Sequence, residues 1–149
     1  MESEDNYDGC SVNVDQILPG LYLGSMAAAY NLDLLQILDV KAIVTVAKGI
    51  EPQFPLEYLV IPVEDHSREV LSDHFEKASG FITKHLKTGS VLVHCANGIS
   101  RSPSMVMAHL MLTQRLTYDQ AFEMVSSLRP CTNPNEGFRS QLRALSDSL

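Results

Sequence analysis

The sequence predicts an α/β fold: a single domain with a central, mostly parallel sheet of four to five strands, flanked by about six helices. Short apolar and β-branched runs, typical of buried strands, alternate with longer segments whose apolar residues recur every three or four positions, typical of helices. The 149 residues suit one domain. Hydrophobic residues make up 45% of the chain, which is enough to build a core.

The first half of the chain alternates strand-like and helix-like segments. The apolar stretch 16–24 is interrupted by Pro19-Gly20, a turn pair, so it predicts two short strands around a turn. Asn31 is a suitable N-cap for a short helix over 32–38. β-branched residues dominate 41–47, which predicts a strand buried on both faces, and a similar pattern predicts a strand over 56–63.

In the second half, one buried strand is expected at 90–94, among helices. The helix that follows this strand is apolar nearly all round, so it should be the central buried helix. Thr117 and Gln120 form a capping box that opens another helix. The four helices are expected over residues 72–87, 102–113, 118–128 and 135–145.

The net charge of −7 is unevenly distributed. Residues 1–15 contain five acidic side chains and no basic one, whereas the rest of the chain carries 11 basic and 13 acidic side chains. We therefore expect residues 1–14 to form a flexible acidic segment, and residues 15–149 to form the folded domain. An acidic chain disfavours partners such as nucleic acids and anionic membranes.

The composition also bears on the compartment. No stretch approaches the ~18 apolar residues of a membrane span, and the N-terminus lacks the apolar core of a signal peptide. We expect a cytoplasmic protein that also has access to the nucleus. The three cysteines, at positions 10, 95 and 131, are too few and too scattered for a disulfide framework or a zinc site.

The segment from 94 to 102 joins a buried strand to the central helix. Ligands of open α/β sheets bind at the carboxyl ends of strands, and helix N-termini offer free N–H groups, so this loop predicts an anion site. Gly98 lets successive N–H groups converge, and Arg101 adds a fork that matches two phosphate oxygens. The same groups would stabilise a thiolate at Cys95, the reactive form of that side chain. A buried structural cysteine is the alternative, which these neighbours make less favoured.

The segment His94–Ser102, HCANGISRS, resembles the signature of cysteine-dependent protein tyrosine phosphatases, H-C-x-x-G-x-x-R-[S/T]. The segments ILPGLYLGS, YLVIPVED and LRPCTNPNEGFRSQL resemble the small, atypical dual-specificity branch of that superfamily, so the resemblance covers about residues 15–145. Ala96 and Asn97 stand in the reverse of a common Asn-Ala order. This departure affects the rim of the pocket, and therefore substrate preference, more than the reaction.

The resemblance implies a role for each residue of the loop. Cys95 would be the nucleophile that forms a phosphocysteine, and Ser102 would donate its hydroxyl to the sulfur when the thiolate leaves. His94 and Asn135 would support the loop through hydrogen bonds. The phosphoryl group would be bound by Ala96, Asn97, Gly98, Ile99, Ser100 and Arg101. This chemistry requires no metal and no cofactor.

The leaving oxygen needs a proton, so a general acid is also required. The resemblance places this acid after the strand YLVIPV, where Asp65 matches the expected position and Glu64 is the rival. Strand alternation should send the two adjacent side chains in opposite directions, so that only one reaches the pocket. We expect this residue to be Asp65.

The resemblance thus implies hydrolysis of phosphotyrosine, and of phosphoserine or phosphothreonine, in phosphoprotein substrates, with a MAP kinase as a substrate by analogy only. A phosphatase of phosphoinositides or RNA 5′ ends is one alternative, which the uncharged side chains at loop positions 96, 97, 99 and 100 disfavour. A catalytically weak phospho-binding module is the other, which the presence of the cysteine, arginine and aspartate disfavours.

Two lesser features accompany the site. Arg129-Pro130, with Phe138, resembles a family segment that packs against the phosphate loop, so these residues are expected to give structural support. Cys131 is a candidate disulfide partner for an oxidised Cys95, because reactive thiols oxidise readily.

Overall fold

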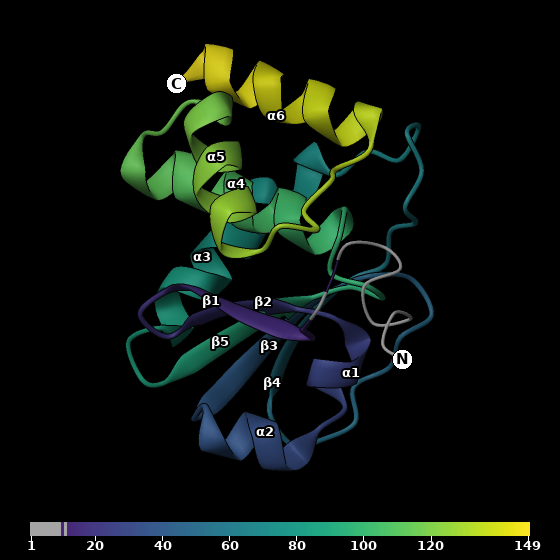
Figure 1. The fold of residues 1–149 in the computed structure, drawn as a ribbon, viewed down its shortest axis with the longest axis vertical. Helices are drawn as coiled ribbons and strands as arrows, with labels where there is room; N and C mark the ends of the chain where they lie inside the picture. Colours follow the sequence, from purple (N-terminus) through teal and green to yellow (C-terminus); the bar gives the residue numbers. More distant parts are fainter. Residues whose placement is uncertain (1–9, 11) are drawn as a thin grey trace.

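The computed structural model describes residue 10 and residues 12–149, in which strands and helices alternate along the chain (Figure 1). The strands are β1 (Val14–Leu18), β2 (Leu21–Gly24), β3 (Val40–Val46), β4 (Glu57–Ile61) and β5 (Ser90–His94). The helices are α1 (Met26–Ala29), α2 (Leu32–Ile37), α3 (Phe75–His85), α4 (Arg101–Gln114), α5 (Tyr118–Leu128) and α6 (Glu136–Ser148), with a 3-10 turn, η2 (Ser72–His74), before α3. The flexible acidic segment predicted for residues 1–14 lies mainly outside the described residues.

One five-stranded sheet has the order β1-β2-β5-β3-β4. Only β1 runs antiparallel to its neighbour, and the other three pairings are parallel, so the predicted mostly parallel sheet is confirmed. β5 lies in the middle of the sheet, with Gly24 of β2 and Thr45 of β3 paired on either side of His94. The loop that leaves the carboxyl end of β5 therefore emerges between two neighbouring strands.

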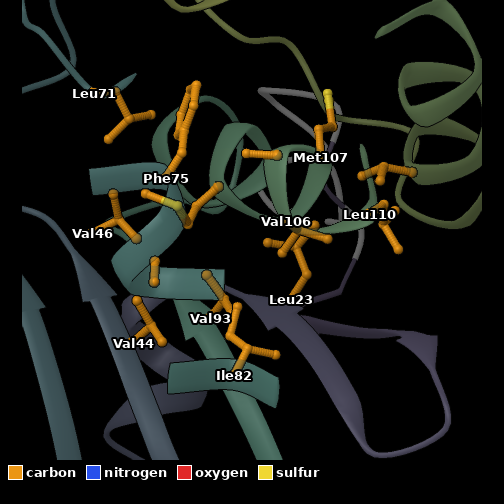
Figure 2. Packing of buried hydrophobic residues seen from close by; sticks show 14 of the residues in the cluster. Leu23, Val44, Val46, Leu71, Phe75, Ile82, Val93, Val106, Met107 and Leu110 are labelled. Atoms are coloured by element: carbon orange, nitrogen blue, oxygen red, sulfur yellow. The ribbon is translucent and has the colours of Figure 1, made fainter. Parts of the chain in front are cut away.

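Helices cover both faces of the sheet (Figure 1): α1 and α2 lie on one face, and α3 to α6 on the other. The larger core cluster fills the space under α3 to α6, and a smaller cluster, which includes Leu35 and Ile43, lies under α1 and α2. In Figure 2, side chains of β2, β3 and β5 such as Leu23 and Val93 lie below those of α4 such as Val106. The residues of α4 from 102 to 111 are all buried, which confirms the predicted central helix.

The capping signals were identified correctly. The Asn31 side chain accepts a hydrogen bond from the Leu34 N–H at the start of α2. Thr117 and Gln120 form the complete capping box of α5. These interactions lie within four consecutive residues, so the local sequence is sufficient to predict them.

Several boundaries differ from the predictions. The strand expected over 56–63 ends at Ile61, because Pro62 has no N–H to donate to the sheet. The helix expected over 72–87 is a 3-10 turn followed by the shorter α3. The helix α1 was not predicted; its first residue, Met26, donates its backbone N–H to the Ala96 carbonyl at 2.9 Å, so a contact distant in sequence supports this short helix. Within residues 12–149, no helix is both long and apolar enough to cross a bilayer.

Candidate active site

The loop between β5 and α4 is attached to its surroundings through its carbonyl groups. The carbonyls of Ala96 and Ile99 accept hydrogen bonds from backbone N–H groups of Met26 and Asn133, at 2.9 and 2.7 Å. Those of Asn97 and Gly98 accept from an arginine side chain described below. In a trans peptide the N–H points away from the C=O, so the N–H groups of residues 97 to 100 point to the opposite side. The loop therefore presents a concave set of donors, suited to an anion.

Gly98 makes this curvature possible. Its φ angle is +71°, in the left-handed region that favours glycine. A Cβ atom at this position would lie 2.7 Å from the Gly24 carbonyl oxygen of β2 and 2.6 Å from an Arg129 nitrogen. A side chain is therefore excluded by both the backbone conformation and the space available.

The sulfur of Cys95 lies at the base of the loop, where the residue is 2% exposed. Its Sγ is 3.1 Å from the Ser102 hydroxyl oxygen, and it accepts hydrogen bonds from the N–H groups of Gly98, at 3.3 Å, and Ser102, at 3.5 Å. Cys95 is a free cysteine. Several donors directed at one sulfur stabilise negative charge on it, as a nucleophilic thiolate requires.

Arg101 provides a cation at the first residue of α4. Its Nη1 donates to the Val63 carbonyl at 3.1 Å, in the segment that follows β4. Its Nε is buried and has no hydrogen-bond partner among the described residues. A buried donor without a partner is energetically costly, so Arg101 is arranged to receive an acceptor such as a phosphoryl oxygen.

His94 is buried at the end of β5, and both ring nitrogens have partners. Nδ1 donates to the Cys95 carbonyl at 3.1 Å, because a carbonyl can only accept, and Nε2 accepts from the Thr45 hydroxyl at 2.9 Å. Burial lowers the pKa of His94 to about 4; the Cys95 hydrogen bond opposes this shift, and the nearby charge of Arg101 adds to it. The ring is therefore neutral at pH 7 and fixes the Cys95 backbone without adding charge.

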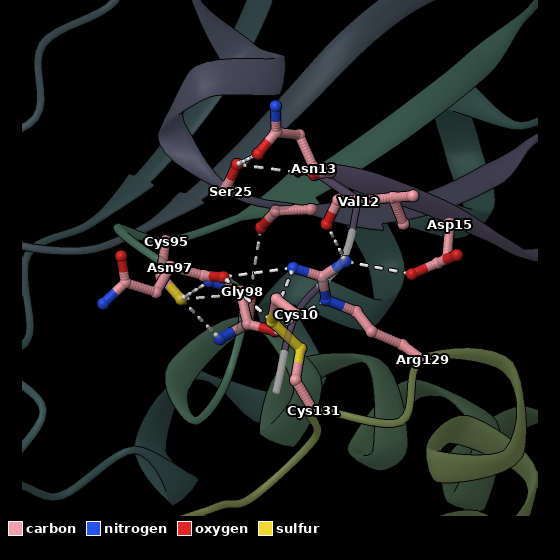
Figure 3. The surroundings of a disulfide bond; sticks show 12 residues. Cys10, Val12, Asn13, Asp15, Ser25, Cys95, Asn97, Gly98, Arg129 and Cys131 are labelled. Carbon is pink, nitrogen blue, oxygen red and sulfur yellow. Dashed lines mark hydrogen bonds and ion pairs between the residues drawn. A yellow bond between two sulfur atoms is a disulfide. The ribbon is translucent and has the colours of Figure 1, made fainter. Parts of the chain in front are cut away.

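Arg129, at the end of α5, contacts the loop on the side of its carbonyl groups (Figure 3). It is 1% exposed. Nε donates to the Gly98 carbonyl at 2.8 Å, and Nη2 donates to the Asn97 carbonyl at 3.1 Å. Nη1 donates to the Val12 carbonyl, at 3.1 Å, and to the Asp15 carboxylate, at 2.9 Å. Sequence reasoning expected structural support from Arg129 but could not identify these partners, which lie 31 or more residues away.

A disulfide between Cys10 and Cys131 lies beside this arginine (Figure 3), with the two Cα atoms 4.9 Å apart. Arg129 Nη2 donates to the Cys10 sulfur at 3.4 Å. The cysteines were expected to be too few and too scattered for a disulfide framework, and this pair was not predicted: the bond spans 121 positions, and no local pattern marks such a contact. The alternative pairing of Cys131 with Cys95 is not found.

The two candidate acids lie beyond the end of β4. The segment from Pro62 onward is not a strand, so the alternation argument used for Glu64 and Asp65 does not apply. The two side chains nevertheless have different partners. An Asp65 carboxylate oxygen accepts a hydrogen bond from the Asn135 amide nitrogen at 2.9 Å, whereas the Glu64 carboxylate lies 3.8 Å from the Lys48 ammonium.

Asn135 connects this segment to the loop. Its side-chain oxygen caps α6 by accepting from the Phe138 N–H at 2.9 Å, and its backbone N–H donates to the Ser100 hydroxyl at 2.9 Å. The Asp65 carboxylate is therefore joined through one residue to the loop that contains Cys95. Within the described part of the chain, no group of three or more histidine, cysteine or acidic residues is arranged to hold a metal ion.

Comparisons with known proteins agree with this arrangement. Residues 21–148 match the family model "Dual specificity phosphatase, catalytic domain". The chain is 37% identical over 140 residues to dual specificity protein phosphatase 1B of Arabidopsis thaliana, covering 92% of this chain and 84% of that protein. It is 40% identical over 131 residues to MAP kinase phosphatase with leucine-rich repeats protein 3 of Dictyostelium discoideum, covering 85% of this chain but only 15% of that protein. The structure of human DUSP28 superposes with a TM-score of 0.88 at 34% identity, covering 92% and 95% of the two chains.

Proposed function

The chain belongs to the dual-specificity phosphatase family, and from this membership and the site geometry we propose that it hydrolyses phosphate monoesters of tyrosine, serine and threonine in proteins. The observation that carries the proposal is the loop around Cys95: a free thiol receives N–H donors, and Arg101, at the end of the same loop, has a buried Nε that finds no partner among residues 10 and 12–149. A nucleophile and phosphoryl-binding donors are thus adjacent.

In the first step, the Cys95 thiolate attacks phosphorus in line with the ester bond. An S–P bond forms, the P–O bond to the leaving group breaks, and the protonated Asp65 carboxyl gives its proton to the leaving oxygen. Arg101 and the loop N–H groups bind the phosphoryl oxygens throughout, which stabilises the charge that develops on them.

In the second step, water attacks the phosphocysteine. Asp65, now a carboxylate, takes a proton from the water, and the S–P bond breaks to release phosphate. The Ser102 hydroxyl, 3.1 Å from the sulfur, donates to the departing thiolate and makes it a better leaving group. The net reaction converts a phosphate monoester and water into an alcohol and inorganic phosphate.

Asp65 is assigned as the acid in preference to Glu64 on the basis of their partners. Asn135 joins Asp65 to the loop, whereas Glu64 pairs with the exposed Lys48. Asp65→Ala should lower the turnover of aryl phosphates with poor leaving groups and leave phosphate binding intact. Glu64→Ala is the matched control, and the assignment is wrong if this control shows the effect instead.

Phosphoproteins are the substrate class that we propose, with a MAP kinase as one substrate by analogy with the name of the Dictyostelium relative. We also propose a cytoplasmic location with access to the nucleus. Polyanionic substrates such as phosphoinositides are less suited to a chain of net charge −7.

Turnover of para-nitrophenyl phosphate by the full chain tests the reaction. Cys95→Ser should abolish turnover while the protein still binds tungstate, a phosphate analogue. Activity that persists in this variant would contradict the covalent mechanism. Tungstate binding by a wild-type protein without turnover would instead favour a phospho-binding module.

A further inference from the structure

The segment from Glu64 to Ser72 carries the proposed acid and lies beside helix α6 (Figure 1). Both ends and the middle of this segment contact α6 or its N-cap residue. We propose that Gln141 of α6 is a positioning residue for catalysis: it fixes this segment so that Asp65 reaches the leaving oxygen. The inference rests on the proposed function of Asp65.

Gln141 uses its whole carboxamide to bind the backbone of this segment. Its side-chain oxygen accepts hydrogen bonds from the N–H groups of Leu71, at 2.7 Å, and Ser72, at 2.8 Å. Its side-chain nitrogen donates to the Glu69 carbonyl at 2.9 Å. One side chain therefore fixes three backbone groups within four consecutive residues, at the end of the segment farther from β4.

Two more residues, at the N-terminal end of α6, contact the rest of the segment. A Cβ atom on Gly137 would lie 1.9 Å from the Ser67 carbonyl oxygen, so the absence of a side chain lets the two backbones approach closely. Gly137 and Gln141 are four positions apart and share one face of α6. Asn135, just before the helix, donates to Asp65. Helix α6 and its N-cap thus meet the segment at three successive points.

Core packing holds the segment only at Leu71, which belongs to the larger core cluster. Residues 64 to 68 are all exposed, and Leu71 is the first fully buried residue after Val63. The internal hydrogen bonds of the segment are short in range, such as Glu69 N–H to the His66 carbonyl at 3.0 Å. Its position relative to the loop therefore depends on a few polar attachments, and Gln141 contributes three of them.

Loss of these attachments should impair the two proton transfers of Asp65 and leave phosphate binding unchanged. A displacement of about 1 Å of a catalytic group costs on the order of 100-fold in rate. The phosphate-binding donors lie on a different segment, between β5 and α4, so they keep their geometry. We expect Gln141→Ala to lower kcat and kcat/KM by about 10-fold for phenyl phosphate, a poor leaving group, with a smaller effect on kcat/KM for para-nitrophenyl phosphate and an unchanged Ki for tungstate.

The conservative variant Gln141→Glu separates the two halves of the carboxamide. It keeps an oxygen that accepts from Leu71 and Ser72 but replaces the donor to the Glu69 carbonyl, so it should recover part of the lost kcat. Ser140→Ala, at an exposed neighbouring position on α6, is the matched control and should behave as the wild type.

A double-mutant cycle with Asp65→Ala distinguishes positioning from a general loss of structure. If Gln141 acts through Asp65, Gln141→Ala should cause no further loss of kcat in the Asp65→Ala background. An equal loss in both backgrounds, or a loss of kcat/KM that is independent of the leaving group, would overturn the inference. Gln141→Glu is carried through the same cycle, so the result stands even if the alanine variant is unstable.

Amide hydrogen exchange of the full chain gives a readout that does not need activity. Exchange of the segment 64–72 should accelerate in Gln141→Ala and not in Ser140→Ala; unchanged exchange would refute the inference. A Cys95→Ser protein that remains active would instead refute the proposed function. So would an Asp65→Ala protein whose loss of turnover is the same for good and poor leaving groups. The two failures are therefore distinguishable.

Discussion

Replacement of Arg129 by methionine tests how strongly the buried guanidinium supports the loop. The variant keeps a long side chain but removes four hydrogen bonds to oxygen. The carbonyl of the buried Gly98 loses its side-chain donor, which costs about 1–3 kcal/mol. Asp15 loses a charge-assisted bond worth about 1.5–3 kcal/mol, whereas the carbonyls of Val12 and Asn97, which belong to exposed residues, are expected to bind water instead. The sum is a loss of about 2.5–6 kcal/mol in the free energy of unfolding.

Urea unfolding of the oxidised protein measures this loss, and thermal unfolding should show a decrease in Tm of about 10 °C. Turnover of para-nitrophenyl phosphate should fall as well, because the Asn97 and Gly98 carbonyls determine the curvature of the loop. Arg143→Met is the matched control: its exposed pairing with Asp119 at 3.6 Å and its position 4.6 Å over the Tyr118 ring should each contribute no more than about 1 kcal/mol. A loss below 1 kcal/mol at Arg129 with unchanged turnover would refute the reasoning.

Three further predictions concern the loop, a buried imidazole and the disulfide. Gly98→Ala should reduce turnover by at least about 100-fold, because the Cβ clashes with backbone, whereas Gly80→Ala, in open space on α3, should leave turnover unchanged. Burial lowers the pKa of His109 to about 4, so the unfolded chain binds a proton there first as the pH falls below 6.5. In urea unfolding at stepped pH, the loss of stability between pH 6.5 and 4 should be about 3 kcal/mol smaller in His109→Gln, which keeps the separate contribution of His94, and equal slopes in the two proteins would contradict this. Reduction of Cys10–Cys131 should lower the free energy of unfolding by up to about 5 kcal/mol on the chain-entropy model, and Cys10→Ser should lack any response to dithiothreitol in thermal unfolding; a response in that variant would point to a different target.

The features that sequence predicted well are those encoded locally. The apolar runs of β3 and β5, the continuous apolar surface of α4 and the capping box at Thr117 each occupy one short stretch of chain. The loop around Cys95 belongs to the same class, because its strand, glycine and helix start are consecutive. Local patterns therefore predicted the fold and the centre of the candidate site.

The features that sequence missed depend on contacts between distant segments. Arg129 meets the loop 31 positions away, and Gln141 binds backbone 69 to 72 positions away. Backbone acceptors carry no sequence signal, so no pattern could have identified these partners. For Glu64 and Asp65, the alternation argument failed because Pro62 ends pairing with the sheet earlier than expected.

One peptide group of the loop has a further electrostatic consequence. The carbonyl of Asn97 accepts from Arg129, and the N–H of the same peptide, on Gly98, donates to the Cys95 sulfur. A cation at the oxygen end polarises the amide and strengthens its N–H as a donor, by about 10–30% in condensed-phase estimates. The guanidinium thus transmits part of its field to the nucleophile without touching it. The negative charge on the sulfur is thereby stabilised in part from the protein interior, by a cation on the side of the loop opposite to its N–H donors.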